Sequence, residues 1–134
     1  MTRVLLNLDV DDLERAVIFY TTAFELHVGR RFDSAFVELL GAEAPIYLLQ
    51  KAAGSLPFAD AEQGRGYARH WTPLHLDLVV DDLDAALARA LAAGAVLEAP
   101  PSQHTYGRLA LLHDPFGHGF CLLQFEGRGY DELL

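Results

Sequence analysis

Apolar and polar residues alternate over residues 4–10 and again over residues 74–80, which predicts a strand at each place. One face of each strand is apolar: Val4, Leu6, Leu8 and Val10 in the first, and Leu74, Leu76, Leu78 and Val80 in the second. An acidic pair follows each strand, Asp11 with Glu14 and Asp81 with Asp84, in the spacing of an N-cap and an N3 residue. A helix is therefore predicted directly after each strand, packed on its apolar face. Residues Leu5, Asn7 and Asp9, and His75, Asp77 and Val79, face the other way.

These two places belong to an internal repeat. Residues 4–13 align without gaps on residues 74–83, and residues 45–50 align on residues 119–124. The repeat predicts two modules, residues 4–51 and 73–126, joined by a linker over 52–72 and followed by a tail over 127–134. Together they form a single domain over residues 1–134.

Each module is predicted to contain a strand, a helix and three more strands. The second helix is expected over Leu83–Ala93, ending at Gly94. The later strands are expected over residues 28–32, 35–40 and 46–50, and over residues 96–98, 108–112 and 120–125. This order, βαβββ repeated once, predicts an α+β fold.

Composition and charge argue against several classes of partner. The 134 residues carry 19 acidic and 10 basic side chains, a formal net charge of -9, so there is no basic surface with which to bind nucleic acid. The single cysteine, Cys121, cannot form an internal disulfide. No apolar run approaches the roughly 20 residues that span a bilayer. We expect no nucleic-acid or membrane partner and a cytoplasmic location.

Three further motifs carry a resemblance to a known family. Residues 10–20 read VDDLERAVIFY at the first helix, residues 94–97 read GAVL, and residues 114–118 read DPFGH, itself mainly a turn motif. With the repeat, they make the chain similar to the vicinal oxygen chelate superfamily, which includes glyoxalase I, bleomycin-resistance proteins and extradiol dioxygenases. The resemblance implies two βαβββ modules with pseudo-twofold symmetry, forming a curved sheet around a cleft. It also implies a homodimer, with twice the mass of the chain in solution.

The resemblance also implies where a metal would bind. In metal-using relatives the ligands come from the opening and final strands of each module, which correspond to Leu5, His75, Tyr47 and Cys121. Only His75 keeps a ligand of the family type, and one imidazole with one thiol is too few for a catalytic divalent ion. We therefore expect no cofactor and no standard metal site, with His75 as the weak candidate. The alternative is a divalent metal ion held by His75, Cys121 and Asp77.

The remaining candidates would bind a ligand in the cleft. Polar residues on a strand face are best explained by a cleft open to water, although Asp9 and Asp77 can also bond strand ends. Arg108 either holds an anionic ligand or pairs with a surface acid, and Trp71 either caps the cleft or packs a dimer contact. The expected ligand-binding residues are Asn7, Asp9, Tyr47, His75, Asp77, Arg108, Cys121 and Trp71.

These observations favour a glyoxalase- or bleomycin-resistance-like protein that binds a small organic molecule without the standard metal site. His75 is as consistent with shaping the cleft as with chemistry, and Cys121 is better explained as a small buried filler. No residue is assigned a catalytic role. The alternative is a metal-dependent lyase, isomerase or dioxygenase of the glyoxalase type.

Overall fold

The computed structural model describes residues 1–134, which divide into two compact units, residues 1–68 and residues 69–134. Each unit contains one α-helix and one four-stranded sheet in the order βαβββ. The predicted α+β class and the two βαβββ modules are confirmed. The boundary between the units falls inside the segment 52–72 that was expected as a linker.

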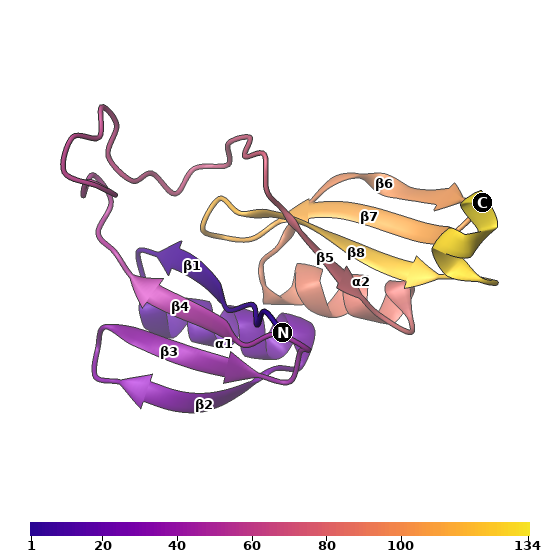
Figure 1. Cartoon of the computed structure of the whole chain (residues 1–134), viewed down its shortest axis with the longest axis horizontal. Helices are drawn as coiled ribbons and strands as arrows, with labels where there is room; N and C mark the ends of the chain where they lie inside the picture. Colours follow the sequence, from indigo (N-terminus) through magenta and orange to yellow (C-terminus); the bar gives the residue numbers. More distant parts are fainter. The chain divides into compact units, whose positions relative to one another are not determined.

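The first unit has its helix on one face of its sheet (Figure 1). Its elements are β1 (Leu6–Val10), α1 (Leu13–Phe24), β2 (His27–Phe32), β3 (Phe36–Leu40) and β4 (Ile46–Gln50). The strand order is β1-β4-β3-β2, with β1 parallel to β4 and the other pairs antiparallel. The opening strand therefore lies beside the final strand of its own unit.

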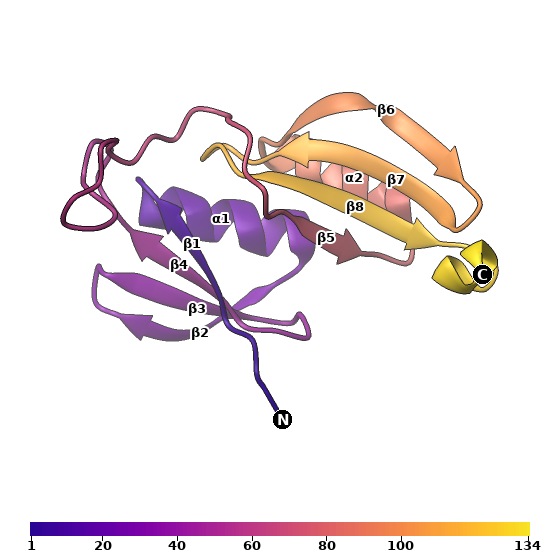
Figure 2. The same cartoon turned by 45° about the horizontal axis from the view of Figure 1, so that its top comes forward.

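The second unit repeats this topology (Figure 2). Its elements are β5 (Leu76–Val79), α2 (Leu83–Ala93), β6 (Val96–His104), β7 (Gly107–His113), β8 (Gly119–Phe125) and a short 3-10 helix, η1 (Gly129–Leu133). The strand order is β5-β8-β7-β6, and β5 runs parallel to β8. No helix in the structure combines the length and the apolar character needed to cross a bilayer.

Both helix N-caps lie one residue later than the acidic pairs suggest, although α2 spans Leu83–Ala93 as predicted. The N-caps are Asp12 and Asp82, not Asp11 and Asp81, because only these carboxylates reach the amides three residues on, those of Arg15 and Ala85. Gly94 ends α2 with φ 115°, as expected for a left-handed cap.

A glutamine from the last strand of each unit also reaches the start of its helix. The Leu13 amide donates to Gln50 Oε1 at 2.7 Å, and the Leu83 amide donates to Gln124 Oε1 at 2.7 Å. The two units therefore share this side-chain contact as well as their topology. It satisfies a helix-start amide that has no partner within the helix.

The core of each unit lies between its helix and the covered face of its sheet. In the first unit Ile46, which pairs with Leu6, is 1% exposed, and in the second Phe120, which pairs with Leu76, is 4% exposed. The predicted register is confirmed, since Leu6 and Leu76 lie on the helix side. A one-residue slip would have exposed these apolar sets to water.

Strand β6 is longer than predicted. It continues past residue 98 to His104 and includes Pro100 and Pro101. Prolines are tolerated because β6 is an edge strand and its pairing with β7 is interrupted by register shifts between Leu97 and Ser102.

Candidate functional site

The sheet face opposite the helix carries the polar candidates in each unit. In the first unit the register aligns Asn7 with Tyr47, and Tyr47 with Glu38, on three neighbouring strands. Since paired residues point to the same face, these three side chains share the uncovered side of the sheet. Arg30 from β2 joins them.

Arg30, Glu38 and Tyr47 form one closed hydrogen-bonded cluster. Glu38 accepts from Arg30 Nη2 at 2.7 Å and Nε at 3.1 Å, and Tyr47 Oη donates to Glu38 Oε2 at 2.7 Å. The guanidinium also donates to Tyr47 Oη at 3.1 Å. The hydrogen bonds from Arg30 and then Tyr47 lower the pKa of Glu38 to about 2, so this buried carboxylate is charged at neutral pH.

Aromatic rings extend this cluster along the same face. Phe32 and Phe36 stack with ring centroids 4.1 Å apart, and Phe36 lies 6.2 Å from the Tyr47 ring. The Arg30 guanidinium is 5.5 Å from the centre of Phe32, a cation–π distance. The first sheet therefore presents a partly aromatic surface on which Arg30, Glu38 and Tyr47 already satisfy one another.

Replacing Glu38 by Gln is expected to reduce the acid sensitivity of the fold. The folded pKa of Glu38, about 2, lies below its ordinary value of 4.5, so its stabilisation is complete above pH 4.5 and is lost as pH falls through 2. The difference in unfolding free energy between wild type and Glu38→Gln should shrink over that window, as measured by urea denaturation. Glu43→Gln, an exposed glutamate between β3 and β4, is the control. A constant difference from pH 5 to pH 2 would contradict the assignment.

Asp9 forms an ion pair with Arg65, a residue that the sequence did not point to. Arg65 Nε donates to Asp9 Oδ2 at 2.8 Å, and Arg65 Nη1 donates to Ser55 Oγ and to the Leu56 carbonyl. Asp9 therefore ties the segment 55–65 to β1. This is the strand-bonding alternative considered for it above.

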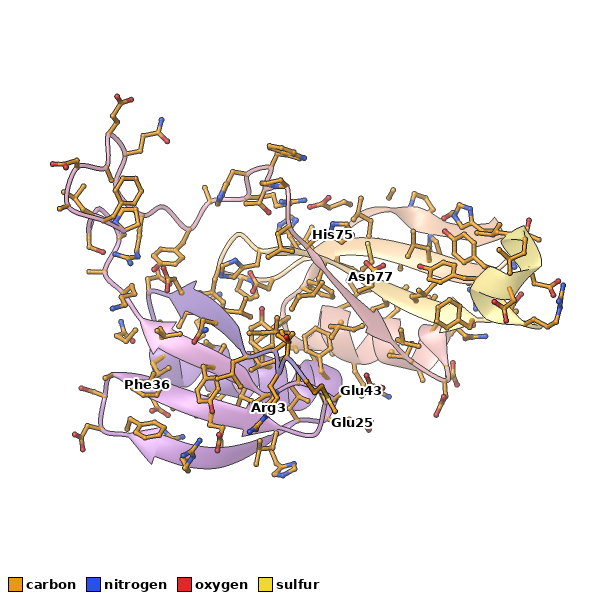
Figure 3. The ribbon with its side chains drawn as sticks, viewed as in Figure 1. Arg3, Glu25, Phe36, Glu43, His75 and Asp77 are labelled. Atoms are coloured by element: carbon orange, nitrogen blue, oxygen red, sulfur yellow. The ribbon has the colours of Figure 1, made fainter.

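His75, Asp77 and Cys121 come together in the second unit. His75 Nε2 lies 3.2 Å from Asp77 Oδ1, and Asp77 is paired with Cys121 across β5 and β8. The potential ligand atoms of all three lie within 4.8 Å of one another. Burial, followed by the charge and hydrogen bond of Asp77, raises the pKa of Cys121 to about 11, so the sulfur is a neutral thiol. Figure 3 shows His75 and Asp77 beside each other at β5.

A second polar cluster occupies the same sheet face, two strands away. Glu98 accepts from Arg69 Nε and lies 3.0 Å from His113 Nδ1, and the bond from Arg69 lowers the pKa of Glu98. His113 pairs with Gly119, and a Cβ on Gly119 would come within 2.5 Å of Arg69 Nη2. Because Gly119 has no side chain, there is room for the Arg69 guanidinium beside it. Glu98 fixes the imidazole through Nδ1, which leaves Nε2 as its second functional atom.

Two other predicted residues lie elsewhere. Arg108 Nη1 and Nη2 donate to the two carboxylate oxygens of Asp84 at 3.1 and 2.9 Å, at the start of α2. Its register partner is Gln124, which bonds the helix, so Arg108 is on the covered side of the sheet. Trp71 precedes β5 and is 80% exposed. The structure does not bring Arg108 to the face that carries His75.

The sequence missed several residues that organise these faces. They are Arg30, Glu38, Arg65, Glu98 and His113. Glu38 had a visible signal, a carboxylate at a buried position inside the apolar strand FVELL. Glu98 and His113 had none, because they meet through a strand pairing that local patterns do not specify.

The ligand positions implied by the resemblance do not form one donor set. Leu5 has no donor atom and is 51% exposed, and the Tyr47 hydroxyl is committed to Glu38. The donors that do converge, an imidazole, a carboxylate and a thiol, all belong to the second unit. These three donors suit a divalent ion better than the four residues at the family's ligand positions do.

Comparison with known proteins agrees with this architecture. Residues 5–123 match the family described as glyoxalase-like domain. The chain belongs to the glyoxalase-like domain family. Its βαβββ units place it in the vicinal oxygen chelate superfamily, as the sequence motifs suggested.

Similar proteins include an uncharacterised protein of Mycobacterium bovis, 29% identical over 133 residues, covering 88% of this chain and 80% of that protein. A glyoxalase/bleomycin resistance protein/dioxygenase family enzyme from Burkholderia phytofirmans matches this glyoxalase-like protein with a TM-score of 0.74 and 23% identity, over 91% of this chain and 97% of the other. The fosfomycin resistance protein FosX from Listeria monocytogenes matches with a TM-score of 0.72 and 20% identity, over 100% and 98%. At these identities the two solved structures establish the fold alone.

Proposed function

We propose that this glyoxalase-like protein binds a small organic molecule on the uncovered face of its second sheet, without the standard metal ligand set of its family. The observation that carries this proposal is the set of ionisable groups there. Asp77 on β5 and His75 just before it have side chains 36% and 56% exposed, and the other face of β5 packs in the core. Partly exposed groups held in place by neighbours are suited to hydrogen-bonding a ligand.

The chemistry of this face suits a polar ligand. The imidazoles of His75 and His113 can each donate or accept, and Asp77 and Glu98 can accept. The exposed apolar side chains of Val79 and Leu111 lie on the same face and supply contacts for the hydrocarbon part of a ligand. A homodimer completing this site is part of the proposal.

Ligand screening by thermal shift tests the proposal, in protein treated with a metal chelator. Fosfomycin and bleomycin, the compounds resisted by proteins of this fold, are the first probes, followed by a library of small polar organic molecules. A compound present at 100 times its Kd should stabilise the fold by about 2.7 kcal/mol, a shift of several degrees.

His75→Ala should reduce the affinity for such a compound at least 10-fold while leaving the fold intact, because the side chain lies outside the core. His27→Ala, an exposed imidazole in the first unit, should leave the affinity unchanged. A screen without any stabilising compound, or equal binding by wild type and His75→Ala, would contradict the proposal.

A metal-dependent lyase, isomerase or dioxygenase is the second candidate. The convergence of His75, Asp77 and Cys121 favours it, since a bound divalent ion polarises the oxygen atoms of a substrate. Metal-stimulated turnover that is lost in Asp77→Asn would place this candidate first.

A further inference from the structure

The best candidate for an unassigned site is the cluster of His75, Asp77 and Cys121. Its three potential ligand atoms differ in chemistry, a ring nitrogen, a carboxylate oxygen and a sulfur, and all lie within 4.8 Å of one another. They come from β5, the residue before it, and the adjacent strand β8, so a single sheet holds them. The first unit contributes nothing to this set.

We propose that His75, Asp77 and Cys121 bind a thiophilic divalent ion, Zn²⁺ in particular. Four-coordinate zinc takes nitrogen and oxygen ligands near 2.0–2.2 Å and sulfur near 2.3 Å, which puts neighbouring ligand atoms about 3.5 Å apart. The contact of His75 Nε2 with Asp77 Oδ1, at 3.2 Å, is already at this spacing. The other distances are at most 4.8 Å, and the side chains of His75 and Asp77 are partly exposed and so have room to rotate toward the sulfur.

The donor set selects the class of ion. Mg²⁺ and Ca²⁺ require six or more oxygen ligands, and this cluster offers one carboxylate. A thiolate with an imidazole suits Zn²⁺ and its spectroscopic substitute Co²⁺. Cys121 would lose its proton to solvent when the sulfur coordinates the ion.

Burial and exposure are arranged as in an open metal site. Cys121 is 5% exposed and anchors the cluster in the sheet, whereas His75 and Asp77 face outward. Three protein ligands leave a fourth position for water or another molecule. The site differs from the ligand set implied by the resemblance, because it uses Asp77 and a thiol and requires neither Leu5 nor Tyr47.

Direct metal titration tests this inference without any organic ligand, so its outcome is independent of the screen described above. Reduced, chelator-treated full-length protein is titrated with Co²⁺, which is then displaced by Zn²⁺. We expect one ion per chain, a thiolate-to-cobalt charge-transfer band in the near ultraviolet, and its loss on adding Zn²⁺. Mg²⁺ should not compete.

Variants identify the ligands. Cys121→Ser should abolish the charge-transfer band. Asp77→Asn and His75→Ala should each weaken Zn²⁺ binding at least 10-fold, as measured by calorimetry. Losing a residue that only supports a metal ligand already costs 10-fold or more in affinity, so losing a ligand should cost at least as much. Asp84→Asn and His27→Ala are matched controls with exposed side chains in other places, and should bind as wild type does.

A fold check accompanies the titration, since Cys121 is buried. If Cys121→Ser does not fold, Cys121→Ala keeps a small apolar group there and Asp77→Asn changes only an exposed position. The proposal is overturned if Co²⁺ gives no charge-transfer band with wild type, or if Zn²⁺ binds the variants and wild type equally. Either result would make the three residues a hydrogen-bonded cluster only.

Discussion

Gly107→Ala is expected to destabilise the protein by about 3–5 kcal/mol, the sum of backbone strain and overpacking. Gly107 begins β7 with φ 145°, a conformation that an L side chain rarely adopts. A Cβ here would overlap the carbonyl oxygen of Gln124 and lie 3.0 Å from the Phe125 Cα, both backbone atoms of the paired strand β8. Neither can move without separating the two strands.

Urea denaturation measures this effect, with Gly66→Ala as the control. Nothing lies within 4 Å of a Cβ at Gly66, and its φ is not positive, so we expect a change within about 0.5 kcal/mol. A loss of 3–5 kcal/mol is a large part of the 5–15 kcal/mol by which a domain is usually stable, and lowers Tm by on the order of 10 °C. Equal midpoints for the two variants would contradict the prediction.

Asp114→Ala should cost about 2–4 kcal/mol. The carboxylate is 1% exposed, and its Oδ1 accepts from the amides of Phe116 at 2.8 Å and His118 at 2.9 Å. Removing it leaves both donors without this acceptor, and each buried amide left unpaired costs about 1–3 kcal/mol. The turn 114–118 leads into β8, so Gly119 and Cys121 should lose order with it.

Thermal melts and amide hydrogen exchange test this second prediction. Asp114→Asn keeps one acceptor oxygen and should lose roughly half as much stability, whereas the exposed Asp60→Ala should lose almost none. Faster exchange at β8 amides is expected in Asp114→Ala. Unchanged stability in Asp114→Ala would mean that the turn is maintained by its backbone bonds alone, those between Asp114 and residues 117 and 118.

The two units have kept their scaffold and diverged on their uncovered faces. Gln50 and Gln124 make the same contact with the two helix starts, because that contact belongs to the shared topology. In the aligned positions of the final strands, however, Tyr47 bonds the buried Glu38 while Cys121 lies beside Asp77. The charged cluster on the first sheet is thus internally satisfied, whereas His75 and Asp77 on the second are partly exposed.

Local patterns were sufficient to predict the modules, the helix positions and the strand faces. Alternation along residues 74–80 placed Leu76 toward the core and His75 opposite, because side chains in a strand point alternately to its two faces. Gly94 predicted the end of α2, because the left-handed conformation at a helix C-terminus favours glycine. The helix caps were misplaced by one residue, because Asp11 and Asp12 are adjacent and chemically identical. Only the structure shows that Asp12 accepts from the amide three residues on, that of Arg15.

Tertiary structure alone decided which polar side chains meet. Arg108 was a candidate for ligand binding, but the pairing of β7 with β8 turns it toward Asp84 on α2. Arg65 reaches Asp9 from 56 residues away, and Glu98 on β6 meets His113 on the neighbouring strand β7. In the regular strands, a period of two determined the face on which a residue lies, as for Leu76 and Asp77 in β5. Register shifts interrupt that period near Arg30 in β2 and near Glu98 in β6. Partners on that face depend on strand order and register, which arise from the packing of the whole unit.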